Sequence, residues 1–160
     1  MSDHDLSNVV RHFLPGGEGF RWQDVALRDY KSDPSAPFRD ITRQTLFGRE
    51  DMRGELRYFE IAAGGHSTLE RHSHTHAVLV LRGMGACLVG TMTFRVAAYD
   101  LVTVPPRTWH QFRASANAPL GFLCMVDAER DRPELPDGET MSALQRDPRV
   151  AAFLAGESRP

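Results

Sequence analysis

The amino-acid sequence predicts an all-β fold, a single antiparallel β-barrel or sandwich. Between Val25 and Val126, short runs of β-branched and aromatic residues alternate with breaks rich in Gly, Pro and Asp, and no helical pattern interrupts them. A long succession of short strands is typical of barrels and sandwiches. The expected strands are Val25–Tyr30, Phe38–Leu46, Glu55–Ile61, Ser67–His74, His76–Leu81, Ala86–Val89, Met92–Val96, Leu101–Val104, His110–Ala114 and Gly121–Val126.

The breaks between these strands carry residues that favour tight turns. They are Gly64-Gly65, Gly83 with Gly85, Gly90-Thr91, Tyr99-Asp100 and Pro105-Pro106. Residues 25–127 are therefore expected to form one barrel domain, with residues 1–24 as an N-terminal helix and arm and residues 128–160 as a C-terminal connector with short helices.

The two flanking segments show helical spacing of apolar residues. Asp5–Leu14 is predicted to be an amphipathic helix that ends at Pro15 and covers an open end of the barrel. After a polar connector over Asp131–Gly138, a helical pattern begins at Met141. Asp147-Pro148 has the form of an N-cap followed by proline at the first helical position, which predicts a second C-terminal helix.

Composition argues against several classes of partner. The chain has 160 residues, 41% apolar and 25% charged, as in an ordinary one-domain globular protein. A net charge of −2 without a basic, aromatic-rich stretch argues against nucleic acid. Apolar runs such as Ala77–Leu81 are far shorter than the ~20 residues of a membrane span, and the N-terminus lacks the order of a secretory signal. Two cysteines, Cys87 and Cys124, are too few for a disulfide framework, so we expect a reducing, cytoplasmic setting.

Three of the seven histidines stand close together, at positions His72, His74 and His76. In a strand, residues at this spacing share one face, and the following Val78 and Val80 indicate that this face is interior. Buried imidazoles need partners for their nitrogen atoms, and a metal ion is such a partner. Alternatively, one or two of these rings bond backbone carbonyls and bind no ion.

Strand geometry adds a condition to a shared metal ion. At about 3.3 Å per residue, the Cα atoms of His72 and His76 would lie about 13 Å apart in a straight strand. One ion can contact both rings only if the chain bends or bulges, so we predict a distortion near Thr75. His4, His12 and His66 are expected to lie outside the site.

Two segments of the chain resemble the sequence motifs of the cupin family. Gly64-Gly65, Glu70-Arg71-His72-Ser73-His74, His76 and Val80–Gly85 resemble the first motif, and Asp100, Pro105 and His110 resemble the second. The resemblance implies a jelly-roll barrel with one metal ion held by His72, His74, His76 and His110. The chain departs from the usual pattern because only Thr75 separates His74 from the next ligand position, and because that position holds His76 instead of Glu. This is similar to the all-histidine subgroup of single-domain cupins.

Four neutral imidazoles on one ion would leave one or two coordination positions open, as in catalytic sites. Ligand softness alone favours Fe, Ni, Cu or Zn over Mn. The resemblance to all-histidine cupins implies Mn(II) instead, which we take as the expected ion, with Fe(II), Ni(II) and Zn(II) as alternatives.

Cys124 is the candidate catalytic residue. Alternation along Gly121–Val126 places Phe122, Cys124 and Val126 on one face, and if this face is inward the thiol lies beside the metal ion. The alternative role is that of a small buried hydrophobic residue, which is the only role expected for Cys87.

Residues 55–133 also resemble a narrower group of small cupins, notably in Arg107–Arg113 and Gly121–Cys124. One of these is the methylthiotransferase that uses glutathione to convert S-methyl-1-thioxylulose 5-phosphate into 1-deoxyxylulose 5-phosphate. The resemblance implies a metal-dependent enzyme and a homodimer, which could exchange the Val25–Tyr30 strand. In such a reaction the carbon that loses sulfur must gain a proton, and a thiol with a pKa near 8.5 is a reasonable donor, so on this hypothesis Cys124 is the acid. The alternatives are a Mn- or Fe-dependent dioxygenase, a sugar isomerase, and a non-catalytic ligand-binding cupin.

A phosphorylated substrate needs cationic or hydrogen-bonding partners. The candidates are Arg43, Arg57 and Arg113, with Gln44, Tyr58 and Gln111 as neutral partners, and a solvated surface position is the alternative for each.

Overall fold

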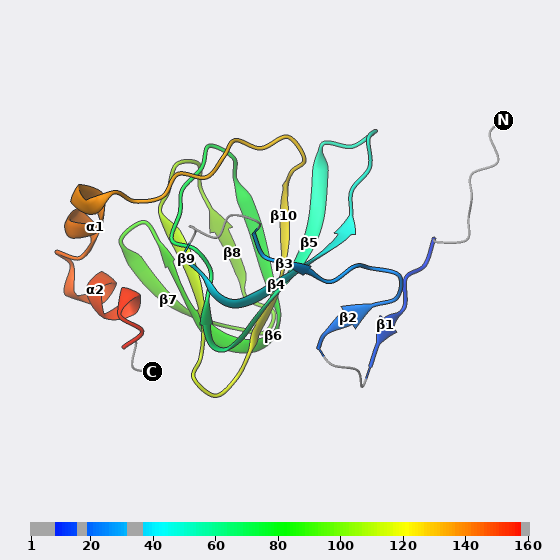
Figure 1. Ribbon diagram of the computed structural model, residues 1–160, viewed down its shortest axis with the longest axis horizontal. Helices are drawn as coiled ribbons and strands as arrows, with labels where there is room; N and C mark the ends of the chain where they lie inside the picture. The colour runs from blue at the N-terminus through cyan, green and yellow to red at the C-terminus, as the bar shows by residue number, and fades with distance from the viewer. Residues whose placement is uncertain (1–8, 16–18, 32–36, 158–160) are drawn as a thin grey trace.

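A computed structural model describes residues 9–15, 19–31 and 37–157 of the chain. The strands form a barrel, with two helices on one side and a small hairpin on the other (Figure 1). The strands are β1 (Phe13–Leu14), β2 (Arg21–Trp22), β3 (Arg28–Asp29), β4 (Arg39–Phe47), β5 (Gly54–His66), β6 (His76–Val89), β7 (Met92–Ala97), β8 (Leu101–Val104), β9 (His110–Ala114) and β10 (Leu120–Asp127). The helices are α1 (Gly138–Leu144) and α2 (Pro148–Leu154).

The barrel closes through its two longest strands, β5 and β6. Each pairs with β10 along one part and with β9 along another, and all pairings are antiparallel. The first half of β6 also pairs with β8 and the second half with β7, while β4 and β3 extend the sheet beyond β5. The predicted all-β, antiparallel barrel is therefore confirmed.

Two glycines allow β6 to turn from β10 to β9. Gly83 has a φ of +72°, and a Cβ atom there would lie 1.7 Å from the carbonyl oxygen of Pro119. At Gly85 a Cβ would lie 2.1 Å from the carbonyl oxygen of Arg113. Any side chain at these positions would push a neighbouring strand away, which explains why the predicted break between two strands is instead a bend within one.

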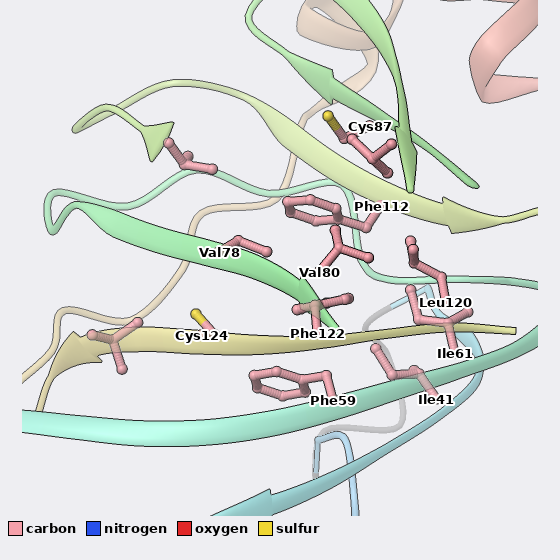
Figure 2. Close-up of a cluster of buried hydrophobic side chains, with 13 residues drawn as sticks. Ile41, Phe59, Ile61, Val78, Val80, Cys87, Phe112, Leu120, Phe122 and Cys124 are labelled. Atoms are coloured by element: carbon pink, nitrogen blue, oxygen red, sulfur yellow. The ribbon is translucent and has the colours of Figure 1, made fainter. Parts of the chain in front are cut away.

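The barrel interior holds one core of alternating strand residues. Phe59, Phe112 and Phe122 lie between β5, β9 and β10 (Figure 2), with ring centroids 5.0 to 5.6 Å apart. Val78 and Val80 of β6 are at most 1% exposed. Full burial of each such side chain stabilises the fold by about 1.5–3 kcal/mol.

The predicted helix over Asp5–Leu14 is wrong in its described part. Residues 5–8 lie outside the described residues, while Phe13 and Leu14 form β1, which pairs with β2. Val9 and Val10 are 69% and 65% exposed, so no apolar helix face is buried there. Phe13 packs instead on Phe20 and Trp22, and these local contacts favour a hairpin over a helix too short to be stable alone.

The predicted strand Ser67–His74 is also wrong. The chain makes only isolated bridges at Glu70 and Arg71, then bends at Ser73 and His74 before β6 starts at His76. Of the predicted Val25–Tyr30 strand, only Arg28–Asp29 is paired, and its partner is β4 of the same chain.

Both predicted C-terminal helices are confirmed. Asp137 and Asp147 cap them by accepting hydrogen bonds from Thr140 N and Arg149 N. The buried faces of the helices form a second apolar cluster with two residues of the barrel domain. Its members are Leu69, Leu88, Leu144, Val150 and Phe153. In the described chain, neither helix has the length or the apolar character needed to cross a membrane.

Candidate metal centre and cavity

A cavity of about 210 Å³ lies inside the barrel. The four candidate histidines line it together with Cys124 and with inward-facing residues of β4, β5 and β9. These groups come from segments far apart in the sequence, which the barrel closure brings together.

The imidazole rings of the four histidines are stacked or edge-on to one another. The ring centroid of His72 lies 3.7 Å from that of His74, 4.3 Å from that of His76 and 4.8 Å from that of His110. Nitrogen atoms of His72, His76 and His110 all lie within 4.8 Å of one another. His74 Nε2 lies 3.1 Å from His76 Nε2.

The bend at Ser73 and His74 makes this convergence possible. It corresponds to the distortion predicted near Thr75, displaced by one or two residues. Two backbone contacts fix the bend, because Arg107 N donates to His72 O at 2.6 Å and Ser73 N donates to the Asp131 carboxylate at 2.7 Å. His110 is fixed from the other side, where its backbone N–H donates to Glu70 O at 2.9 Å.

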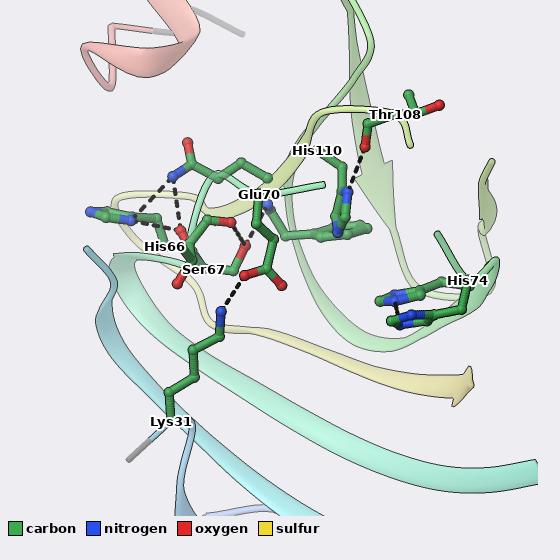
Figure 3. Close-up of polar contacts among 11 residues, drawn as sticks. Lys31, His66, Ser67, Glu70, His74, Thr108 and His110 are labelled. Atoms are coloured by element: carbon green, nitrogen blue, oxygen red, sulfur yellow. Dashed lines mark hydrogen bonds and ion pairs between the residues drawn. The ribbon is translucent and has the colours of Figure 1, made fainter. Parts of the chain in front are cut away.

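Each imidazole has a protein partner at Nδ1. His72 and His110 use carbonyl oxygens, those of His74 and Thr108, each at 2.9 Å. The Nδ1 atom of His74 lies 2.8 Å from the Asp131 carboxylate. Figure 3 shows the contact between His110 and Thr108. Because a carbonyl oxygen or carboxylate only accepts, these contacts place the ring proton on Nδ1 and leave the lone pair on Nε2.

The rings of His72, His76 and His110 are held in the neutral form that metal binding requires. Burial, reinforced by the neighbouring histidines, lowers the pKa of His76 to about 2, and burial lowers that of His110 to about 4. Burial also lowers the pKa of His72. Hydrogen bonds from His74 and Ser73 hold the pKa of Asp131 well below its usual range, so this partner is a carboxylate.

These residues fit a divalent metal ion. His72 Nε2 is buried and has no hydrogen-bond partner among the described residues, which is unfavourable unless a ligand contacts this nitrogen. Two nitrogens bound to one ion at about 2.1 Å and at a right angle lie about 3.0 Å apart, close to the 3.1 Å between His74 Nε2 and His76 Nε2. The histidines could therefore hold one ion through Nε2.

Cys124 faces the same cavity. It is 3% exposed, and its Sγ lies 3.4 Å from His76 Nδ1. Burial, with a smaller contribution from Glu70, raises the pKa of the Cys124 thiol to about 12. The expected inward face of β10 is confirmed, since Phe122 and Val126 are buried as well.

Comparison with known proteins agrees with this geometry. The family described as "Cupin domain" matches residues 57–126. A Rhodospirillum rubrum protein named 1-methylthio-D-xylulose 5-phosphate methylsulfurylase is 54% identical, over 98% of this chain and 98% of that protein. The chain belongs to the cupin family.

Solved structures of other cupins have the same fold. The crystal structure of a cupin-2 domain protein from Rhodospirillum rubrum has a TM-score of 0.84 and 54% identity, and covers 92% of this cupin and 99% of its own chain. The crystal structure of a cupin 2 conserved barrel domain protein from Rhodopseudomonas palustris has a TM-score of 0.83 and 50% identity. The match covers 90% of this cupin and 97% of that chain.

The predicted substrate-binding residues of this cupin fall into two groups. Arg43 and Arg57 line the cavity. The remaining candidates face away from it. Gln44 bonds Phe20 O and Trp22 N, Tyr58 bonds Glu60, Gln111 bonds Ser67 O, and Arg113 bonds Leu154 O. Strand alternation explains the split, because neighbours along a strand point to opposite faces.

Three cavity residues were not among the sequence candidates. Asp131 holds His74, and Lys31 forms an ion pair with buried Glu70 (Figure 3). Asp131 and Lys31 lie outside the two histidine motifs, and no spacing rule connects them to these motifs. Glu70 directly precedes Arg71-His72, so only its position next to the motif could have marked it.

Proposed function

We propose that this cupin is a metal-dependent enzyme that removes the methylthio group from 1-methylthio-D-xylulose 5-phosphate and yields 1-deoxyxylulose 5-phosphate. One observation carries the proposal, the end-to-end 54% identity to the protein of that name. The site supports it, because a thiol lies next to the histidines that could hold a metal ion.

His72, His74, His76 and His110 would hold the ion, with Mn(II) as our assignment and Fe(II), Ni(II) or Zn(II) as alternatives. A divalent ion bound there would act as a Lewis acid toward the substrate carbonyl. The rings of His72, His74 and His110 are fixed through their Nδ1 partners, so the site needs little rearrangement when ligands bind.

Glutathione supplies the thiol in the proposed reaction. Its sulfur attacks the methylthio sulfur, the bond from that sulfur to C1 breaks, and the electron pair of that bond moves into the sugar as an enolate. A mixed disulfide of glutathione and methanethiol forms, and C1 takes one proton to become a methyl group. The thiol sulfur is oxidised and C1 is reduced, so electrons balance, and the proton released by glutathione replaces the one consumed.

Cys124 is the proposed donor of the proton to C1. When His76 Nε2 is a ligand, its Nδ1 carries the ring proton and donates to Cys124 Sγ, which leaves the S–H free to face the cavity. The raised pKa keeps the thiol protonated at neutral pH, as a general acid must be. A free thiol also agrees with our expectation of a reducing, cytoplasmic setting.

The direct test is an anaerobic assay of the purified protein with the methylthio sugar phosphate and glutathione, together with metal analysis. We expect 1-deoxyxylulose 5-phosphate and the mixed disulfide in equal amounts without oxygen. Turnover that requires oxygen would support a dioxygenase instead. Light scattering of the same preparation tests the expected homodimer.

A further inference from the structure

Arginines gather where β3, β4 and β5 lie side by side. Arg28 of β3 is the register partner of Arg43 of β4, and Arg57 of β5 is the partner of Thr45, two residues along β4. Directly opposite residues share a face with Cβ atoms about 5 Å apart, and diagonal neighbours are about 7–8 Å apart. Arg28, Arg43 and Arg57, the arginine triad, therefore project from one face of the sheet.

The arginine triad is poorly neutralised by the protein. Within the described residues, neither Arg28 nor Arg43 forms an ion pair, and Arg43 Nε is buried without a hydrogen-bond partner. Arg57 pairs with Glu55, but Glu55 also receives Arg130. Like charges directly opposite on paired strands are destabilising, so the sheet retains a repulsion that a bound anion would relieve.

The arginine triad stands between the barrel cavity and an outer pocket. Arg43 and Arg57 line both spaces, and Arg28 lines the outer pocket, whose volume is about 430 Å³. Arg57 is also the register partner of Cys124, whose thiol contacts His76. Three strand steps of about 4.8 Å separate β4, which carries Arg43, from β6, which carries His76. Both side chains line the cavity between these strands.

We infer that the arginine triad is the subsite for the phosphate group of the sugar phosphate. This assignment rests on the proposed function, since a phosphorylated sugar has one anionic end and one end with carbonyl and hydroxyl oxygens. The anionic end lies against the arginines while the oxygenated end lies against the histidines. Guanidinium groups suit this role because they bind phosphate oxygens through two parallel hydrogen bonds. Lys31 also lines the cavity, but Glu70 neutralises it.

The test compares a phosphorylated with a non-phosphorylated sugar on the metal-loaded protein. Calorimetry measures the dissociation constants of xylulose 5-phosphate and xylulose for the wild type, Arg43→Gln, Arg28→Gln and the control Arg95→Gln, an exposed residue of β7. We expect Arg43→Gln to weaken binding of the phosphorylated sugar about tenfold or more, and Arg28→Gln somewhat less, with xylulose unaffected. Arg95→Gln changes neither, and Arg43→Lys recovers part of the loss.

Two outcomes overturn the subsite. One is an unchanged preference for xylulose 5-phosphate in Arg43→Gln protein whose thermal unfolding is normal. The other is loss of that preference in Lys31→Met but not in the arginine variants. Because xylulose 5-phosphate carries no methylthio group, the binding result does not depend on the reaction. A lost preference in a protein that never releases the methylthio group removes the proposed function and keeps the subsite.

Discussion

The histidine end and the arginine end of the cavity satisfy their polar groups in opposite ways. At the histidine end, protein partners occupy Nδ1 of His72, His74 and His110, and burial keeps His72 and His110 neutral. At the arginine end, Arg28 and Arg43 keep their charge without an ion pair among the described residues. A set of neutral lone pairs suits a cation, and a set of incompletely neutralised positive charges suits an anion.

The two ends also differ in how firmly the protein holds them. The histidine rings are fixed by contacts with the segments that precede β6 and β9, with β10 and with the C-terminal connector. Arg28 is exposed and Arg43 is half-buried, both on strands near the edge of the sheet. We conclude that the histidine end is preorganised, while the arginine end keeps the freedom to adjust to a ligand.

The largest expected effect is that of removing the metal ion. Dialysis against a chelator should abolish methylthio release, because none of the described side chains that line the cavity is a Lewis acid comparable to a metal ion. Adding back Mn(II), Fe(II), Ni(II) or Zn(II) singly and measuring rate and bound metal identifies the native ion. Full activity in protein shown to be free of metal would refute the role given to the histidine end.

Replacement of Cys124, the proposed proton donor, should have the next largest effect. Cys124→Ala is expected to lower kcat by about 10²–10⁴-fold, as for loss of a general acid, with metal content unchanged. Cys87→Ala is the matched control, because Cys87 is an equally buried free cysteine in the core. An unchanged kcat in Cys124→Ala would leave Cys124 as a packing residue only.

Asp131 tests whether the fixed geometry of the histidine end matters for metal binding. It contacts His74 but lies in neither histidine motif. Asp131→Ala should weaken metal binding about 10–100-fold, since His74 loses the partner that orients its ring. Asp131→Asn keeps an acceptor and should fall between this variant and the wild type. Glu129→Ala, an exposed acidic residue two positions earlier, is the control in a competition assay with a chelating dye. Equal affinities in all four proteins would contradict this role.

The smallest effect concerns acid stability. In the metal-free protein, His110 has a pKa of about 4, whereas an unfolded histidine titrates near 6.5. Below pH 6.5 the unfolded chain therefore binds a proton that the folded chain does not, so stability falls as the pH falls from about 6.5 to about 4. Between pH 7 and 5 this amounts to about 2 kcal/mol. Urea unfolding at both pH values measures it. His110→Gln should remove this contribution and make the pH dependence less steep, while His72 and His76, whose pKa values are also lowered, keep theirs. His12→Gln, on the exposed arm, is the control for a surface substitution.

The histidine end was largely predictable from the sequence, because three of its rings lie within five consecutive residues. Strand length alone required a bend between His72 and His76, and the structure has one at Ser73 and His74. The predicted strand Ser67–His74 failed for the same reason, since a straight strand would hold the rings apart. Most barrel strands were predicted correctly, because apolar and polar residues alternate along a strand in step with its buried and exposed side chains.

The arginine end could not be assembled from the sequence. Its members come from three separate strands, and their neighbourhood depends on register, which no local pattern fixes. For the same reason Gln44, Tyr58 and Gln111 were candidates although their side chains face away from the cavity. The N-terminal helix failed because helical spacing in a short segment does not show whether a surface exists to bury it.

The C-terminal connector determines how short a fragment of this protein can be made without loss of the proposed metal affinity. Asp131 holds the bend between His72 and His76, and Glu134 bonds to Arg71 through backbone and side chain, yet both residues follow the last strand. A fragment ending with β10 would contain all four histidines and every strand of the barrel. We nevertheless expect it to bind metal more weakly than the whole chain. A truncated protein that keeps full metal affinity should therefore extend at least to Glu134.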